Sequence, residues 1–159
     1  MDNKTEKFIA QAKLANKKIV FTNGVFDILH KGHVDYLNEA AKLGDILIVG
    51  INSDDSVKRL KGPERPVNRE LDRSFIIENL KSVDKTIVFG EDTPLELIRK
   101  ILPDILVKGG DYDANEVDKN SNKYIVGSDI VKSYGGRVVT IELTEGRSTT
   151  NVINQIRKR

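Results

Sequence analysis

The sequence of 159 residues contains no cysteine, and none of its apolar runs approaches the roughly 20 residues that a membrane-spanning helix needs. The lack of cysteine excludes a disulfide framework and a thiolate metal site. The N-terminal segment also has neither the apolar core nor the small-residue cleavage site of a secretory signal. We therefore expect a soluble cytoplasmic protein without a membrane partner.

Neither sign of charge dominates the sequence. Lysine and arginine number 26 against 24 aspartates and glutamates, which leaves a net charge of +2, and both signs are scattered along the chain. Because a general binder of nucleic acid concentrates positive charge, we expect no nucleic-acid partner. No repeat, low-complexity segment or flexible linker divides the sequence, whose length is typical of one domain. We predict a single domain over residues 1–159.

Short apolar runs rich in valine and isoleucine alternate with segments of helical periodicity. Continuous apolar strands are typical of a parallel sheet that is covered on both faces. The alternating order therefore predicts an α/β fold, doubly wound and Rossmann-like, with a five-stranded parallel sheet and helices on both faces. Strands are predicted at residues 18–22, 45–51, 85–89, 104–107 and 137–143, and helices at 5–16, 32–43, 69–81, 94–102, 129–134 and 150–157.

Two helix ends carry specific signals. Thr93, followed by Pro94 and Glu96, predicts a helix that is capped by Thr93 and has proline at its first position. Gly135 predicts the end of the helix before it, because glycine readily adopts the left-handed conformation that often follows a helix.

Ligands of doubly wound folds bind beyond the carboxyl ends of the strands, so the segment after the first strand is informative. It holds both histidines of the protein, His30 and His33, with Gly32 between them. At the start of a helix, two imidazoles and free backbone N–H groups can hold an anion, and Gly32 lets a phosphate approach closely. The pattern favours stabilisation of phosphate charge.

Other interpretations of the two histidines stay open on these grounds. The pair could cap or pack a helix without binding a ligand. A zinc site is the weaker alternative, because the sequence has no cysteine and no third ligand at a suitable spacing. We therefore predict no metal site held by the protein itself.

The stretch GVFDILHKGHVDYLNEAAKLGDILIVGINSD resembles the signature of the cytidylyltransferase-like nucleotidyltransferase superfamily, in which a His-x-Gly-His motif grips the nucleotide phosphates. The stretches RPVNRELDRSFIIENLKSVD, FGEDTPLELI, PDILVKGGDY, GGRVV and EGRSTTNVI extend the resemblance over roughly residues 17–157. Together they are similar to the adenylyltransferase domain of bacterial ADP-heptose synthesis. The resemblance implies a nucleotidyltransferase that moves AMP from ATP to a sugar 1-phosphate, D-glycero-β-D-manno-heptose 1-phosphate.

The resemblance also implies roles for individual residues. It makes three residues catalytic through contacts with the phosphates: His30, His33 and Lys61. It assigns nucleotide binding to Asn23, Gly24, Phe26, Gly32, Arg73, Lys108, Gly109, Gly110, Ser148, Thr149 and Thr150. It places three carboxylates at the acceptor substrate: Asp27, Asp54 and Asp111.

Several of these residues have an equally ordinary structural interpretation. The basic segment 58–67, which contains Lys61, could be a solvated loop rather than one that closes over phosphates. Arg73 could be a solvated helical arginine, and the role of Asp54 could be simply to cap a turn.

The last two segments are open in the same way. The glycine pair Gly109 and Gly110 could serve only a turn, and helix capping alone explains one hydroxyl of the Ser-Thr-Thr stretch. The polar loop 113–123 either covers the acceptor or lies in solvent.

The choice of ATP depends on one position. Relatives that use CTP to activate glycerol phosphate carry an arginine two places before the Glu-Gly pair, where this sequence has Leu143. We expect Mg²⁺ held mostly by ATP and water, a homo-oligomer, and a separate heptose kinase that supplies the acceptor. Two rivals are a cytidylyltransferase of the same fold acting on an alcohol phosphate, and a regulatory module that binds a nucleotide without catalysis.

Overall fold

The computed structural model describes residues 1–142 and 149–158, without the side chain of Arg157. Within these residues, five parallel strands form one sheet in the order β3-β2-β1-β4-β5. The strands are β1 (Ile19–Gly24), β2 (Ile46–Asn52), β3 (Lys85–Phe89), β4 (Ile105–Gly109) and β5 (Arg137–Ile141). The helices are α1 (Asn3–Leu14), α2 (Lys31–Ala41), α3 (Asp54–Lys61), α4 (Glu70–Glu78), α5 (Leu95–Ile101), α6 (Ser128–Ser133) and α7 (Thr149–Arg157).

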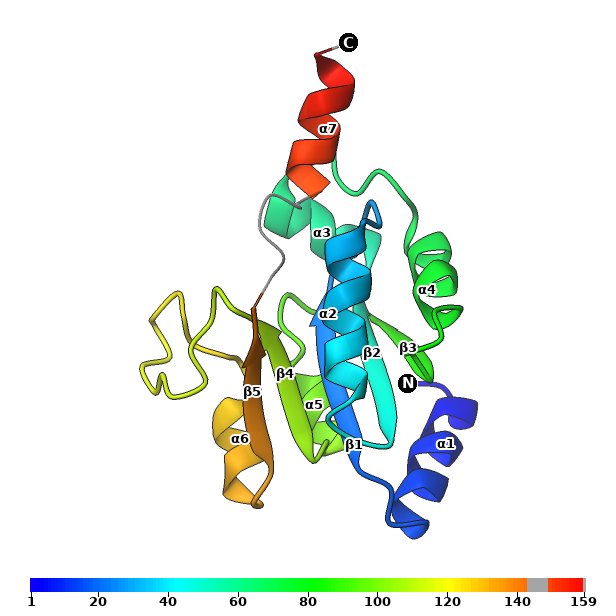
Figure 1. The fold of residues 1–159 in the computed structure, drawn as a ribbon, viewed down its shortest axis with the longest axis vertical. Coiled ribbons are helices and arrows are strands. Elements are labelled where there is room, and N and C mark those ends of the chain that lie inside the picture. The colour runs from blue at the N-terminus through cyan, green and yellow to red at the C-terminus, as the bar shows by residue number, and fades with distance from the viewer. Residues whose placement is uncertain (143–148, 159) are drawn as a thin grey trace.

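Helices cover both faces of the sheet, as the sequence predicts (Figure 1). On one face, α1, α5 and α6 pack against alternate strand residues, and Phe21, Leu97 and Val131 belong to one buried apolar cluster there. On the other face, α2 and α4 bury Leu37 and Ile77 against the remaining strand residues. The strands are continuous apolar runs because neither face of the sheet meets water. No helix in the described ranges is both long and apolar enough to cross a bilayer.

The strand order reverses direction between β1 and β4. From β1 the chain builds outward to β2 and β3, and it then returns to the other side of β1 to add β4 and β5. Such a switch point leaves a crevice at the carboxyl ends of the two central strands. The fold therefore places the ends of β1 and β4 at the expected position for a ligand.

One helix lies where the sequence predicts a loop. Helix α3 follows β2 directly, and Ser53 caps it by accepting a hydrogen bond from the Ser56 N–H. It ends at Lys61, and Gly62 follows with a φ of 95°. The helix has no apolar stripe, since Ser56 and Val57 are its only buried residues, so no periodicity could reveal it. The prediction that Lys61 lies in a loop is wrong.

The two predicted helix ends have different outcomes. Helix α5 begins one residue later than expected, with Pro94 rather than Thr93 in the capping position, and no side chain caps it. The prediction of Thr93 as cap is therefore wrong; Thr93 instead faces the cavity described below. The signal of Gly135 is confirmed, because this residue follows α6 with a φ of 84° and donates its N–H to the Lys132 carbonyl.

The loop 113–123 projects from the sheet beside α6 (Figure 1). It is fastened to itself and to α6 by the Asp113 N–H to Lys123 carbonyl bond, at 3.0 Å, and by the Lys119–Asp129 ion pair, at 2.5 Å. None of its residues lines the cavity below. The loop is therefore held in place beside the cavity without forming part of its walls.

Candidate active site

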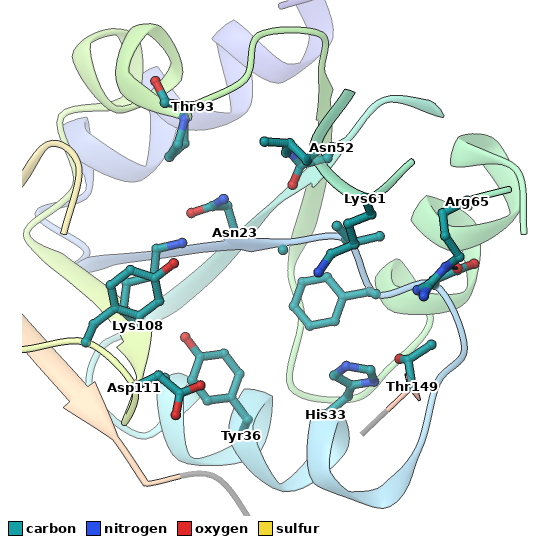
Figure 2. A pocket seen from close by; sticks show the side chains of 18 of the residues that line it. Asn23, His33, Tyr36, Asn52, Lys61, Arg65, Thr93, Lys108, Asp111 and Thr149 are labelled. Atoms are coloured by element: carbon teal, nitrogen blue, oxygen red, sulfur yellow. Dashed lines mark hydrogen bonds and ion pairs between the residues drawn. The ribbon is translucent and has the colours of Figure 1, made fainter. Parts of the chain in front are cut away.

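A cavity of about 710 Å³ opens at the carboxyl ends of β1 and β4. It lies at the switch point, and the starts of α2 and α7 and the end of α3 contribute to its walls (Figure 2). The structure brings most of the predicted site residues together here: Asn23, Gly24, Phe26, Asp27, His30, Gly32, His33, Lys61, Lys108, Gly109, Asp111, Thr149 and Thr150.

The two histidines stack on each other at the start of α2. Their ring centroids are 3.8 Å apart with an interplanar angle of 21°, and Phe26 meets His33 edge-on at 5.2 Å. His30 occupies the capping position of α2, but its side chain makes no capping hydrogen bond. His30 therefore does not cap the helix through its side chain, and both histidines line the cavity.

His33 is uncharged at neutral pH. Burial, and secondarily the charge of His30, lower the pKa of His33 to about 4. The buried Nδ1 of His33 has no hydrogen-bond partner among the described residues. A neutral imidazole with an unsatisfied nitrogen at a helix start is suited to hydrogen bonding with a ligand rather than to simple charge attraction.

Gly24 and Phe26 shape the turn that leads to the histidines. A Cβ at Gly24 would lie 2.9 Å from the Phe26 ring, so only glycine leaves room for the aromatic side chain there. Phe26 itself has a φ of 48°, in the left-handed region that is unusual for such a residue. The turn thus sets Phe26 against His33 and fixes the imidazole from one side.

Lys61 and Thr149 complete the end of the cavity that holds His33 (Figure 2). Lys61 is exposed, as the last residue of α3. The Thr149 hydroxyl donates to the Ile28 carbonyl at 3.4 Å, which ties the start of α7 to the loop before α2. This end of the cavity combines a lysine, a histidine pair and two helix starts. Because helix N-termini favour anions, it is suited to bind an anionic group. Ser148 lies outside the described residues.

Asp27 lines the cavity, but its carboxylate is already engaged. It accepts hydrogen bonds from the backbone N–H groups of Val67 and Asn68, each at 2.9 Å, and pairs with Arg65 at 2.7 Å. Burial alone would raise the pKa of Asp27, but these three donors together lower it. Asp27 therefore anchors the segment 65–68 as an ion, and its contact with the acceptor stays a prediction.

Arg73 and Asp54 are placed behind the cavity rather than in it. The Arg73 guanidinium is fully buried and donates to the carbonyls of Val25, Asn52 and Asn68, at 2.6 to 3.0 Å. It also bonds the Asp54 carboxylate at 2.8 Å. Neither residue lines the cavity. Both side chains bind protein groups here, and the contacts of Arg73 with the nucleotide and of Asp54 with the acceptor stay predictions.

The end of β4 contributes Lys108, Gly109 and Asp111 to the opposite side of the cavity (Figure 2). Burial lowers the pKa of Lys108 to about 8, and its ammonium lies 5.3 Å from the centre of the Tyr112 ring. Gly110 does not line the cavity. A Cβ there would lie 3.3 Å from the Cα of Glu142, so this glycine serves the close approach of the segment after β5.

Several cavity residues were not predicted. The structure adds Tyr36, Asn52, Leu60, Arg65, Asp92, Thr93, Pro94, Tyr112, Tyr124 and Val126 to the walls. Arg65 and Tyr112 lie beside predicted residues in segments that the sequence already singles out. Tyr36 has no local signal, because its hydroxyl reaches Thr22 of the neighbouring strand, at 2.7 Å, only once α2 packs on the sheet.

Metal-ligating side chains do not gather anywhere in the described part of the chain. No group of three or more histidine, aspartate or glutamate side chains there comes close enough to hold an ion. The carboxylates of Asp27 and Asp54 are committed to Arg65 and Arg73. The donor set present does not form a protein cage for a divalent ion.

Comparisons with known proteins agree on one family. Its sequence profile, described as cytidylyltransferase-like, matches residues 21–155. The bifunctional protein HldE of Syntrophotalea carbinolica is 56% identical over 140 residues, which are 88% of this chain and 27% of that protein. HldE of Nitratiruptor sp. is 55% identical over 141 residues, 89% of this chain and 28% of that protein. The chain spans little more than a quarter of the length of these relatives.

A solved structure supports the same relationship. The lipopolysaccharide core biosynthesis protein of Thermoplasma volcanium superposes with a TM-score of 0.61 at 31% sequence identity. The match covers 82% of this chain and 99% of that one. The chain therefore shares its fold with a protein whose structure is solved.

Proposed function

The chain belongs to the cytidylyltransferase-like family, and on that premise we propose that it transfers AMP from ATP to D-glycero-β-D-manno-heptose 1-phosphate. The observation that carries the proposal is the stacked His30–His33 pair at the start of α2, in one cavity with Lys61 and Thr149. The similarity to bifunctional HldE proteins supports the sugar phosphate as acceptor. The products are ADP-heptose and pyrophosphate.

The reaction needs little covalent chemistry from the protein. An oxygen of the acceptor phosphate attacks the α-phosphorus of ATP, and the bond from that phosphorus to the oxygen bridging the α- and β-phosphates breaks. The acceptor phosphate is ionised at neutral pH, so no catalytic base is required. The barrier comes mainly from charge repulsion and alignment. His30 and His33 donate hydrogen bonds to the reacting phosphates, and Lys61 with Thr149 and Thr150 holds the departing pyrophosphate.

Mg²⁺ enters this scheme as part of the MgATP substrate. The carboxylates of Asp27 and Asp54 are committed to arginines, which supports an ion held by phosphate oxygens and water. A homo-oligomer and a separate heptose kinase stay predictions. Exposed apolar side chains on α4, Leu71 and Phe75, offer one surface where a second copy could bind.

The test is a panel of substrates with pyrophosphate release as the readout. ATP or CTP is supplied with the heptose 1-phosphate, a hexose 1-phosphate or glycerol 3-phosphate, and kcat/KM is measured for each pair. We expect ATP with the heptose 1-phosphate to exceed every other pair by orders of magnitude, since a site that pairs buried polar groups with hydroxyls rejects substrates lacking them. A preference for CTP or for glycerol 3-phosphate contradicts the proposal, and no turnover of any pair favours a regulatory module.

We predict that Lys61→Gln lowers kcat/KM for ATP by about tenfold or more, the usual effect of losing a hydrogen bond to a charged group. The matched control is Lys58→Gln. Lys58 lies one turn earlier on α3, pairs with Asp55 in solvent and does not line the cavity. Because an exposed pair contributes little, the control should keep near-normal activity. Equal losses in both variants would show that α3 offers only diffuse positive charge.

A further inference from the structure

We propose that Lys108 and Asn23 form the subsite for the acceptor, with the Lys108 ammonium binding its phosphate and the Asn23 side-chain oxygen accepting from a sugar hydroxyl. The inference rests on the proposed function and deepens it. It differs from the nucleotide contacts that the sequence resemblance implies for both residues.

Sheet register places the two side chains next to each other. Phe21 of β1 and Leu106 of β4 are paired, and Asn23 and Lys108 follow them by two residues on the same strands. Because side chains alternate along a strand, Asn23 and Lys108 share the sheet face of Phe21 and Leu106. That face packs against α5, whereas the histidines belong to α2 on the other face.

Both groups are chemically unsatisfied. The buried side-chain oxygen of Asn23 has no hydrogen-bond partner among the described residues. Among the described residues, the half-buried Lys108 ammonium makes no ion pair or hydrogen bond, and its one polar contact is with the Tyr112 ring. A buried acceptor without a hydrogen bond and a cation without an anion both destabilise the protein when no ligand is bound. A ligand with an anionic group and a hydroxyl donor satisfies both, whereas a nucleobase brings no negative charge.

The in-line geometry of phosphoryl transfer indicates that the ligand of Lys108 and Asn23 is the acceptor. Attacking and leaving oxygens lie roughly in line on opposite sides of the reacting phosphorus. If pyrophosphate leaves toward Lys61 and Thr149, the nucleophile must come from the other side of the cavity. Figure 2 shows Lys108 on that side, across from His33 and Thr149. The carboxyl end of β4 is thus positioned to hold the attacking phosphate.

The test compares Lys108→Met with Lys108→Arg, and uses Lys100→Met, an exposed lysine change on α5, as control. KM is measured for the heptose 1-phosphate at saturating MgATP and for ATP at saturating acceptor. We expect Lys108→Met to raise the acceptor KM by about 10-fold to 100-fold and to leave the ATP KM nearly unchanged. Lys108→Arg should restore part of the loss because it keeps the charge. A rise confined to the ATP KM, or no change in either, overturns the subsite.

A binding readout separates this inference from the proposed function. Lysines are ¹³C-dimethylated, and the Lys108 resonance is identified by its absence from Lys108→Met. We expect the heptose 1-phosphate to shift that resonance and a non-hydrolysable ATP analogue to leave it in place. If the substrate panel shows no turnover but the shift occurs, the subsite stands while the proposed reaction fails. A shift with the ATP analogue alone, or with neither ligand, refutes the subsite.

Discussion

Replacement of His33 by alanine is expected to lower kcat for pyrophosphate release by about 100-fold or more while the protein stays folded. This is the scale of losing one preorganised donor to a transition state. His33 stacks on His30 at 3.8 Å and is fixed from the other side by Phe26, so its position is set before the substrate binds. His30→Ala should have an effect of the same order, because the two rings stack and line the same end of the cavity.

The control for the histidines is Lys31→Ala. Lys31 lies between them in sequence, but its side chain points to solvent and pairs with Asp35. Its removal should leave kcat near that of the unmodified protein. Near-normal turnover of a folded His33→Ala variant would contradict the catalytic assignment and leave the pair a structural one.

The charge state of His33 gives an independent check by NMR titration of the imidazole. Because burial and His30 lower the pKa of His33 to about 4, the ring should stay neutral from pH 8 down to about pH 5 in the free protein. The negative charge of bound ATP should then raise the pKa. A titration of His33 near 6.5 in the free protein would mean that the ring is solvated and does not pack as described.

Arg73→Met is expected to lower the free energy of unfolding by about 3–5 kcal/mol, the usual cost of breaking a buried ion pair and its hydrogen bonds. Methionine can fill much of the space but cannot donate to the carbonyls of Val25, Asn52 and Asn68. It also leaves Asp54 without its cation. Urea unfolding at equilibrium measures the loss.

Arg69→Met is the comparison for this variant. Arg69 precedes α4 by one residue and is exposed, with no side-chain bond to the helix end. Its replacement should change stability little, as for most exposed positions. If Arg73→Met kept its stability and lost only ATP use, the nucleotide contact implied by sequence resemblance would be the better explanation.

The framework of the fold is readable from the sequence because it depends on local patterns. Strand β2 is a run of seven buried residues, and helix α2 before it buries Tyr36, Leu37 and Ala40 along one face. Parallel pairing and two covered faces follow from those runs. Hydrophobic periodicity does not predict helix α3, because its only buried residues are Ser56 and Val57 and most of its other residues are charged. Where packing does not use an apolar stripe, periodicity carries no information.

The residues at the phosphate end of the site lie close together in the sequence, whereas the other site residues are brought together only by folding. His30, Gly32 and His33 lie within four residues, so the motif survives in the sequence as a unit. Arg73 is the opposite case. Its partners Val25 and Asn52 are 48 and 21 residues away, and only folding shows that a helical arginine turns inward. Asn23 and Lys108 likewise come to the same cavity only because β1 and β4 are neighbours in the sheet.

The hydrogen bonds of Asp27 and Arg73 separate positions around the cavity where substitution should destabilise the fold from positions where it should be tolerated. These two side chains bind the turn after β1, the end of β2 and the segment 65–68 into one network of hydrogen bonds. A library that varies this network would return mostly unfolded proteins. Thr93, Tyr112 and Tyr124 line the cavity from segments outside the network. If the proposed function holds, selection for new acceptor sugars is therefore best confined to these three positions.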